Sequence, residues 1–239
     1  MRIAFFGDSL TSGVPGSSYF AILRERFPDD TLLNFGKGND TVVSLYRRIS
    51  AMQFDKPLDI AFLWIGVNDV PQTDRWPYRA FNTLLAQRQA RDMGEFRAYY
   101  RTTLNLLCDN ARRVIVAPPA LRGENPENRW NRRLAALAGL IQDVAANCER
   151  AEFLDLRTIF AQELAERPII SDHVPENPFR VLLDALILRT DGQIDRKAAK
   201  RGLHLTLDGV HLNSAGARLV AEEFAVAIQS LASQVRQVR

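Results

Sequence analysis

Two short stretches near opposite ends of the chain carry side chains that can do chemistry together. Gly7-Asp8-Ser9-Leu10 places a serine where an apolar run ends, and Asp208-Gly209-Val210-His211 places a carboxylate three residues before an imidazole. A serine hydroxyl is a poor nucleophile until a base accepts its proton, and the base needs a group that fixes its tautomer. Ser9, His211 and Asp208 therefore supply the parts of an activated serine nucleophile, although each stretch alone also fits an ordinary turn.

Two further loops offer hydrogen-bond donors for the oxyanion of a tetrahedral intermediate. Asn68, in Gly66-Val67-Asn68-Asp69, follows an apolar run and has a neutral side-chain amide that can donate. The loop 34–41 contains Gly36 and Gly38, whose small size lets a backbone N–H approach the same place. Either loop could also be an ordinary connection between a strand and a helix. Each therefore indicates a function only in combination with the other motifs.

Short apolar runs alternate with helical patterns along the whole chain, which predicts an α/β fold. The runs are continuous, as in strands covered on both faces. Five strands predict a mainly parallel sheet of order 2-1-3-4-5 between two helical layers, with the reactive residues outside the carboxyl ends of the strands. We expect these strands at residues 3–6, 32–35, 60–65, 114–117 and, more weakly, 153–156.

The chain is expected to form one domain over residues 1–239. Segment 70–89 and segment 167–207 do not fit a minimal strand–helix alternation, and the second is expected to be an insertion or lid. Its apolar stretches Val181-Leu182-Leu183 and Leu186-Ile187-Leu188 can cover an acyl chain, pack on the body of the protein or meet a second subunit. The sequence does not decide among these, nor does it give an oligomeric state.

The composition is that of an ordinary globular protein. The 239 residues are 46% hydrophobic and 25% charged, and the net charge of +3 is too small and scattered to indicate a nucleic-acid partner. No stretch is apolar enough to span a bilayer, and no signal peptide is seen before the first strand, so a cytoplasmic protein is expected, although a removed leader would leave no trace. Cys108 and Cys148 are expected as buried or half-buried thiols, with a disulfide left open.

The motifs, in this order, resemble the GDSL esterase/lipase family in its SGNH hydrolase form. The matching stretches are Gly7-Asp8-Ser9-Leu10, Gly66-x-Asn68-Asp69 and Asp208-x-x-His211. The resemblance implies a flavodoxin-like α/β/α fold and a serine hydrolase of esters or thioesters. It also implies that Ser9, Asp208 and His211 are catalytic and that Asn68 belongs to the oxyanion hole.

One stretch departs from the family pattern. The family usually has a glycine directly before the Asp-Thr pair of its second motif, whereas this chain has Asn39 there, after Gly38. The donor at this place is a backbone N–H, which asparagine keeps, and asparagine tolerates left-handed backbone angles. We therefore expect an oxyanion hole of Ser9, Asn39 and Asn68, with Gly38 as a substitute for Asn39.

The expected function is hydrolysis of a carboxylic ester or thioester through an acyl-enzyme on Ser9, with a small or medium acyl group favoured. Two other functions stay open: an acyltransferase that uses the same acyl-enzyme, and a non-catalytic anion-binding domain of the same fold. No metal or organic cofactor is expected, because a serine, an imidazole and a carboxylate complete the reaction themselves. The expected partner is a small-molecule ester or thioester.

Overall fold

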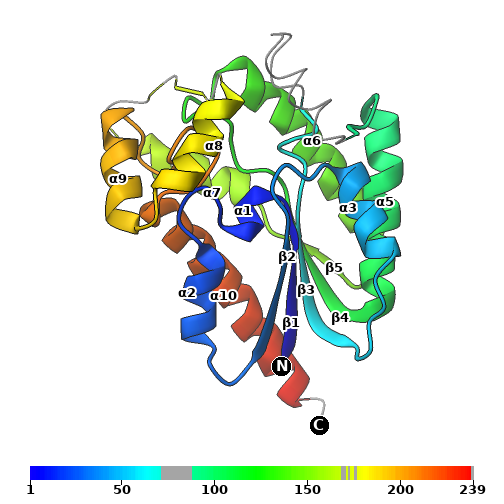
Figure 1. Ribbon diagram of the computed structural model, residues 1–239. Coiled ribbons are helices and arrows are strands. Elements are labelled where there is room, and N and C mark those ends of the chain that lie inside the picture. The colour runs from blue at the N-terminus through cyan, green and yellow to red at the C-terminus, as the bar shows by residue number, and fades with distance from the viewer. Residues whose placement is uncertain (71–87, 168–170, 172, 175–176, 238–239) are drawn as a thin grey trace.

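The computed structural model describes residues 1–70, 88–167, 171, 173–174 and 177–237. In these ranges five strands form one parallel sheet in the order β2-β1-β3-β4-β5 (Figure 1). The predicted α/β architecture and strand order are confirmed. The strands are β1 (Arg2–Gly7), β2 (Thr31–Gly36), β3 (Leu58–Trp64), β4 (Ala111–Ala117) and β5 (Ala151–Phe153).

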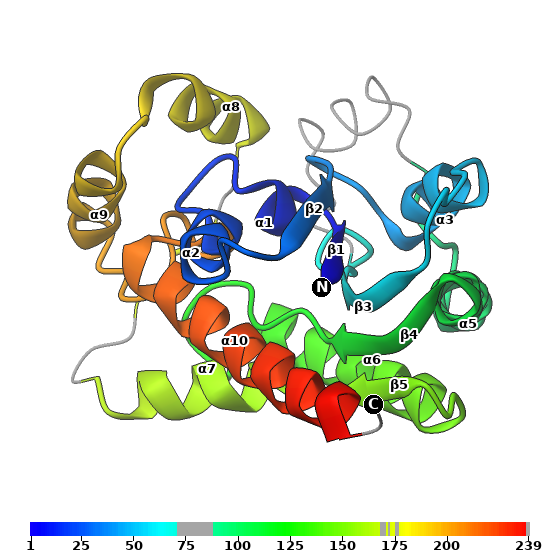
Figure 2. The same ribbon diagram turned by 90° about the horizontal axis from the view of Figure 1, so that it is seen from below.

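Helices cover both faces of the sheet. Helices α3, α5 and α6 pack on one face, whereas α2, α7 and α10 pack on the other, and Figure 2 shows α3 and α5 opposite α2 and α10. None of the helices in the described ranges is long and apolar enough to cross a membrane. The helices are α1 (Ser9–Ser12), α2 (Tyr19–Arg26), α3 (Val42–Ser50), α5 (Met93–Asn110), α6 (Arg129–Ala146), α7 (Leu156–Ala165), α8 (Pro178–Ile187), α9 (Asp191–Lys200) and α10 (Ser214–Gln237).

The continuous apolar runs follow from this double cover. Successive side chains of a strand point to opposite faces, so a strand buried on both faces needs apolar residues throughout. In β1, Ile3 and Phe5 belong to the core under α2, α7 and α10, while Ala4 and Phe6 belong to the core under α3, α5 and α6. All four side chains are fully buried.

The carboxyl ends of the three strands that precede the predicted reactive loops are level with one another. Gly7 of β1 pairs with Gly36 of β2 and with Trp64 of β3. A Cβ on Gly7 would lie 2.4 Å from the Trp64 backbone oxygen and 2.3 Å from Thr11 Oγ1, so only glycine fits at this crossing. The loops after β1, β2 and β3 therefore leave the sheet side by side.

The fifth strand lies earlier than predicted. It was expected at residues 153–156, but β5 covers Ala151–Phe153. The Asp155 side chain accepts a hydrogen bond from Thr158 N at 3.1 Å and caps α7, which begins at Leu156. The helix cap thus removes the second half of the predicted strand, although Leu154 and Leu156 are apolar.

The segment predicted as an insertion or lid contains α8 and α9. Asp184 anchors α8, because its buried carboxylate accepts a hydrogen bond from Arg201 Nη2 at 2.6 Å. Val181 and Leu188 are half-buried. Five large apolar side chains of α8 are exposed by about half or more: Phe179, Leu182, Leu183, Leu186 and Ile187. The other irregular segment, 70–89, lies outside the described residues except at its two ends.

The two cysteines lie against each other, Cys108 in the last turn of α5 and Cys148 just after the end of α6. The Sγ atoms of Cys108 and Cys148 are 2.7 Å apart, and both are free thiols in this structure. Burial is the main reason that the pKa of Cys108 rises to about 12, and the hydrogen bond with Cys148 adds to the effect. The pair joins two helices that cover the same face of the sheet.

Candidate active site

Ser9 is the first residue of α1, the short helix that follows β1 at the carboxyl ends of the strands (Figure 1). The Asp8 side chain caps α1 by accepting a hydrogen bond from Leu10 N at 3.0 Å. Gly13, with φ of 76°, ends the helix by donating its N–H to Ser9 O at 2.9 Å. A short helix capped at both ends leaves the serine little freedom.

Ser9, His211 and Asp208 form a connected chain of contacts. Ser9 Oγ lies 3.0 Å from His211 Nε2, and His211 Nδ1 lies 2.8 Å from Asp208 Oδ2. Both distances are those of hydrogen bonds. The structure therefore brings together a serine and an imidazole that are 202 positions apart in the sequence. All three residues are buried, with 6% of Ser9, 8% of His211 and 2% of Asp208 exposed.

The Asp208 carboxylate also folds the turn that carries His211. Its Oδ1 accepts hydrogen bonds from Val210 N at 3.0 Å and from His211 N at 2.9 Å. Gly209 adopts a left-handed φ of 92°, and Leu207 N donates to His211 O at 2.6 Å, which closes the turn. One carboxylate thus shapes the loop with one oxygen and orients the imidazole with the other.

Mutual interactions set the protonation of this pair. Burial is the largest effect on Asp208 and opposes its ionisation, but the charge of His211 and the hydrogen bonds from His211 and Val210 together lower its pKa to about 2. Burial also acts to lower the pKa of His211, yet Asp208, helped by Asp8, raises that pKa above its ordinary 6.5. An ionised Asp208 holds a proton on Nδ1 and leaves Nε2 as the acceptor that faces Ser9.

Asn68, in the loop after β3, directs its side-chain amide at the loop after β2. Its Nδ2 donates to the backbone oxygen of Asp40 at 2.9 Å, while its own backbone oxygen accepts a hydrogen bond from Gln89 Nε2 at 2.6 Å. The residue is 8% exposed. An amide nitrogen carries two hydrogens, so this contact orients the amide and leaves one hydrogen for a ligand.

Asn39 has the backbone conformation that a glycine would adopt at no cost. Its φ is 61°, and its buried Nδ2 has no hydrogen-bond partner among the described residues. Gly38 lies in open surroundings, where an added Cβ would meet nothing within 4 Å. Lys37 N donates to Gly7 O at 3.1 Å, which ties this loop to the turn that carries Ser9.

Three carboxyl groups brace these loops. Asp69 Oδ2 accepts a hydrogen bond from Val42 N at 2.9 Å, and Asp40 Oδ2 accepts one from Arg48 Nη2 at 2.7 Å.

Burial raises the pKa of Asp8 to about 7. The charge of Asp40 adds to the rise, whereas the hydrogen bond from Leu10 N–H and the charge of His211 oppose it. Burial likewise raises the pKa of Asp69 to about 8, and the charges of Asp8 and Asp40 add to it. The loops after β1, β2 and β3 therefore share one electrostatic environment with His211.

Sequence reasoning missed Arg122, which follows β4 at the same edge of the sheet. It is buried to all but 2%, and its guanidinium carbon lies 5.2 Å from the centre of the Trp130 ring. Its positive charge acts to lower the pKa of His211, against the larger effect of Asp208. The one available signal was its position just after a predicted strand, because an isolated arginine usually indicates a solvated surface.

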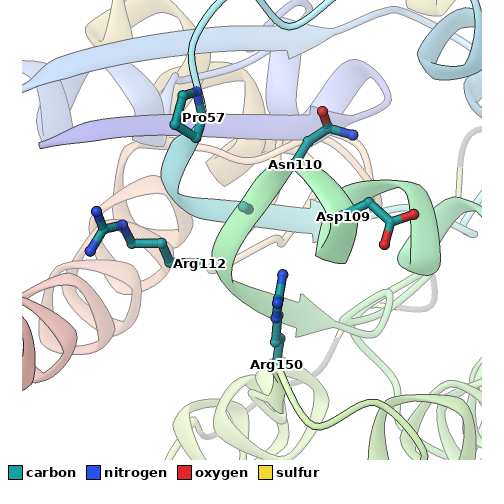
Figure 3. Close-up of a pocket in the computed structure, with 6 residues that line it drawn as sticks. Pro57, Asp109, Asn110, Arg112 and Arg150 are labelled. Atoms are coloured by element: carbon teal, nitrogen blue, oxygen red, sulfur yellow. The ribbon is translucent and has the colours of Figure 1, made fainter.

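One described pocket lies away from these residues. It has a volume of about 320 Å³ and is lined by Pro57, Asp109, Asn110, Ala111, Arg112 and Arg150 (Figure 3). Pro57 precedes β3 and Ala111 begins β4, so the pocket sits at the amino ends of the strands. Ligands of open α/β sheets bind at the carboxyl ends. The cluster around Ser9 is therefore the better candidate active site.

Solved structures share the fold of this chain. An acetyl xylan esterase, AlAXEase, superposes with a TM-score of 0.67 at 23% identity, over 95% of this chain and 100% of that chain. LAE5, an alpha/beta hydrolase enzyme from the metagenome of Lake Arreo, Spain, gives 0.65 at 21% identity, over 96% and 95%. Axe2, an acetylxylan esterase from Geobacillus stearothermophilus, gives 0.64 at 18% identity, over 93% and 91%.

The family assignment comes from the sequence. Among curated proteins, no relative matches this chain. The model of the GDSL-like lipase/acylhydrolase family matches residues 5–219, a range that contains Ser9, Asn39, Asn68, Asp208 and His211. The chain is a carboxylic ester hydrolase and belongs to the GDSL-like lipase/acylhydrolase family.

Proposed function

We propose that this protein hydrolyses a carboxylic ester through an acyl-enzyme formed on Ser9. The observation that carries the proposal is the pair of contacts that joins Ser9 Oγ to His211 Nε2 at 3.0 Å and His211 Nδ1 to Asp208 Oδ2 at 2.8 Å. A hydroxyl, a base and an orienting carboxylate in this order are the parts that nucleophilic acyl transfer requires.

In the first half of the reaction, His211 Nε2 accepts the Ser9 proton as Ser9 Oγ attacks the acyl carbon. Asp208 stabilises the imidazolium that forms, since it is buried beside Nδ1 and its pKa is lowered to about 2. His211 then protonates the departing alcohol oxygen. In the second half, His211 activates a water molecule that attacks the acyl-enzyme, and Ser9 leaves with the proton.

The oxyanion is stabilised by donors from three loops: the backbone N–H of Ser9, the backbone N–H of Asn39 and the side-chain amide of Asn68. The contact between Asn68 Nδ2 and Asp40 O supports the third assignment, because it fixes the amide and leaves a hydrogen to donate. The left-handed backbone of Asn39 supports the second, since it reproduces the conformation open to a glycine at this place. Gly38 N–H is the substitute donor if Asn39 does not contribute.

We further propose a small acyl group, of which acetyl is the first candidate. The support is that two of the similar structures are described as acetylxylan esterases, and their likeness spans almost the whole chain. An acetylated carbohydrate is accordingly the first alcohol component to test. Activity on p-nitrophenyl esters from acetyl to palmitoyl decides the point, with the highest kcat/KM expected at acetyl.

Covalent labelling tests the proposed mechanism. Incubation with an alkyl fluorophosphonate should add one phosphonyl group to the protein, and peptide mass spectrometry should locate it on Ser9. A domain that only binds anions would hold the reagent reversibly and show no mass increase. An acyltransferase would be labelled in the same way, and product analysis with and without an added carbohydrate acceptor separates it from a hydrolase.

A further inference from the structure

We propose that Glu124, together with Thr206, is the positioning unit that holds the Asp208–His211 turn in register with Ser9. The proposal rests on the proposed function, because it takes His211 to be the base that serves Ser9. Glu124 lies in the loop after β4 and has no exposed surface. This glutamate belongs to none of the sequence motifs described above.

The Glu124 carboxyl group binds the segment that leads into the turn. Its Oε2 accepts a hydrogen bond from His204 N at 2.7 Å, and its Oε1 accepts hydrogen bonds from Leu205 N and Thr206 N, both at 2.8 Å. The Thr206 hydroxyl donates a fourth hydrogen bond to Oε1, also at 2.8 Å. One side chain thus satisfies three consecutive backbone N–H groups that lie 80 to 82 positions away in the sequence.

Thr206 connects Glu124 to the Asp208–His211 turn through hydrogen bonds. While its Oγ1 donates to Glu124, the same oxygen accepts a hydrogen bond from Gly209 N at 3.1 Å. Gly209 O accepts a hydrogen bond from Gly123 N at 2.6 Å. Gly123 precedes Glu124, so the loop after β4 makes a second contact with the turn. A Cβ on Gly209 would lie 3.2 Å from Gly123 Cα, which shows how closely the two loops pack.

The geometry links these contacts to His211 directly. Thr206 pairs with Leu212 as an antiparallel bridge, and Leu207 N donates to His211 O at 2.6 Å. A displacement of Thr206 therefore carries the His211 backbone with it. The contact between Ser9 Oγ and His211 Nε2 is 3.0 Å long, and a misplacement of about 1 Å in a catalytic group can cost on the order of a hundredfold in rate.

The first test is Glu124→Gln, which keeps size and shape. The amide oxygen can still accept from the Oε1 position, but the amide nitrogen then faces His204 N–H, a donor against a donor. We expect kcat on p-nitrophenyl acetate to fall about 10- to 100-fold while KM changes less than about threefold, because alignment of the base is lost and the substrate contacts are not. An unchanged kcat in a folded Glu124→Gln protein would overturn the proposal.

A matched control separates positioning from loss of stability. Asp59 lies near the amino end of β3, away from Ser9, and its Oδ2 accepts a hydrogen bond from Arg2 N at 2.8 Å. Asp59→Asn makes the same chemical change, and kcat should stay within about twofold of the unmodified protein. A fall in kcat that follows thermal stability in both variants would contradict a positioning role for Glu124.

The second test uses Thr206, and it stands even if Glu124→Gln does not fold. Thr206→Val keeps the shape but removes both hydroxyl contacts, whereas Thr206→Ser keeps the hydroxyl. We expect kcat to fall about tenfold in Thr206→Val and to remain within about threefold in Thr206→Ser. Equal activity of the two variants would show that the Thr206 hydroxyl does not position the Asp208–His211 turn. Fluorophosphonate labelling of Ser9→Ala tests the proposed function independently of these variants. Labelling that continued without the Ser9 hydroxyl would refute the proposed function, whereas loss of labelling would leave the role of Glu124 to be decided by the kcat values above.

Discussion

Asn68 Nδ2 donates a hydrogen bond to the backbone oxygen of Asp40 at 2.9 Å, and this contact joins the loop after β3 to the loop after β2. It aligns the Asn68 side-chain amide with the loop whose backbone we propose as the source of a second oxyanion donor. The oxyanion hole proposed here is therefore assembled from neighbouring strands of the sheet, which Gly7 holds level by pairing with both Gly36 and Trp64.

Removal of the Asn68 amide should lower kcat strongly. Asn68→Ala should cost about 10²–10³ in kcat on p-nitrophenyl acetate, the usual effect of one lost oxyanion donor. Steady-state kinetics with far-ultraviolet circular dichroism as a folding control measures it. Asn68→Asp is the close isostere and should be at least as impaired, because it replaces the donor by a carboxylate. If either variant retained full kcat, Asn68 would have no place in the oxyanion hole.

The left-handed backbone of Asn39 makes a prediction about stability. Asn39→Ala should lower the free energy of unfolding by about 1 kcal/mol, because a Cβ at φ of 61° is strained and alanine has no side chain that eases the strain. Asn39→Gly removes that strain and should keep kcat within about threefold, since the backbone N–H remains. Urea unfolding and steady-state kinetics are the measurements. A loss of kcat in the glycine variant would assign the donor to the buried Asn39 side chain instead.

The labelling rate of Ser9 should depend on the protonation of His211. Only the neutral imidazole accepts a proton, and its pKa is raised above 6.5, so the rate of phosphonylation should rise with pH through a midpoint above 6.5. Asp208→Asn removes the main cause of the rise, so the midpoint should move to lower pH while the plateau rate falls. Stopped assays between pH 5 and pH 9 test this. A midpoint that did not move in Asp208→Asn would contradict the pairing of the two residues.

The buried carboxyl group of Asp8 should make the fold less stable as pH rises. Its pKa is about 7 in the folded protein against 3.8 for an ordinary aspartate, so between about pH 4 and pH 7 the unfolded chain loses a proton that the folded chain keeps. Asp8→Asn keeps the helix cap and cannot ionise. Its unfolding free energy should match that of the unmodified protein near pH 4 and exceed it by at least about 1 kcal/mol at pH 8.5. Urea unfolding at the two pH values decides it, and parallel behaviour of the two proteins would show that Asp8 does not titrate in this way.

The sequence predicts the sheet well because the signal for a strand covered on both faces is local. The run from Ile3 to Phe6 is apolar without interruption, and the strand is there, with all four side chains buried. The start of the fifth strand was predicted two residues too late. The prediction followed the apolar residues Leu154 and Leu156 and did not take into account that Asp155 caps α7. A cap competes with a strand through a hydrogen bond that periodicity does not register.

The positioning and electrostatic residues could not be predicted, since their roles depend on contacts across the fold. In the sequence, Glu124 and Arg122 are isolated charged residues in a loop. Such residues usually lie on the surface, yet both are buried. Glu124 meets its three N–H donors 80 to 82 positions later in the chain. Nothing near either residue in the sequence indicates those partners. The proximity of Ser9, His211 and Asp208 could be predicted because their types and order repeat a known pattern, and Glu124 belongs to no such pattern.

The most direct test of the account is the turnover of p-nitrophenyl acetate by Ser9→Ala. The side chain of Ser9 is small and buried, so its removal should leave the fold intact and remove the nucleophile alone. The account predicts a loss of about 10⁶ in kcat, the scale seen when one member of such a unit is removed. Hydrolysis by Ser9→Ala at the rate of the unmodified protein would contradict it.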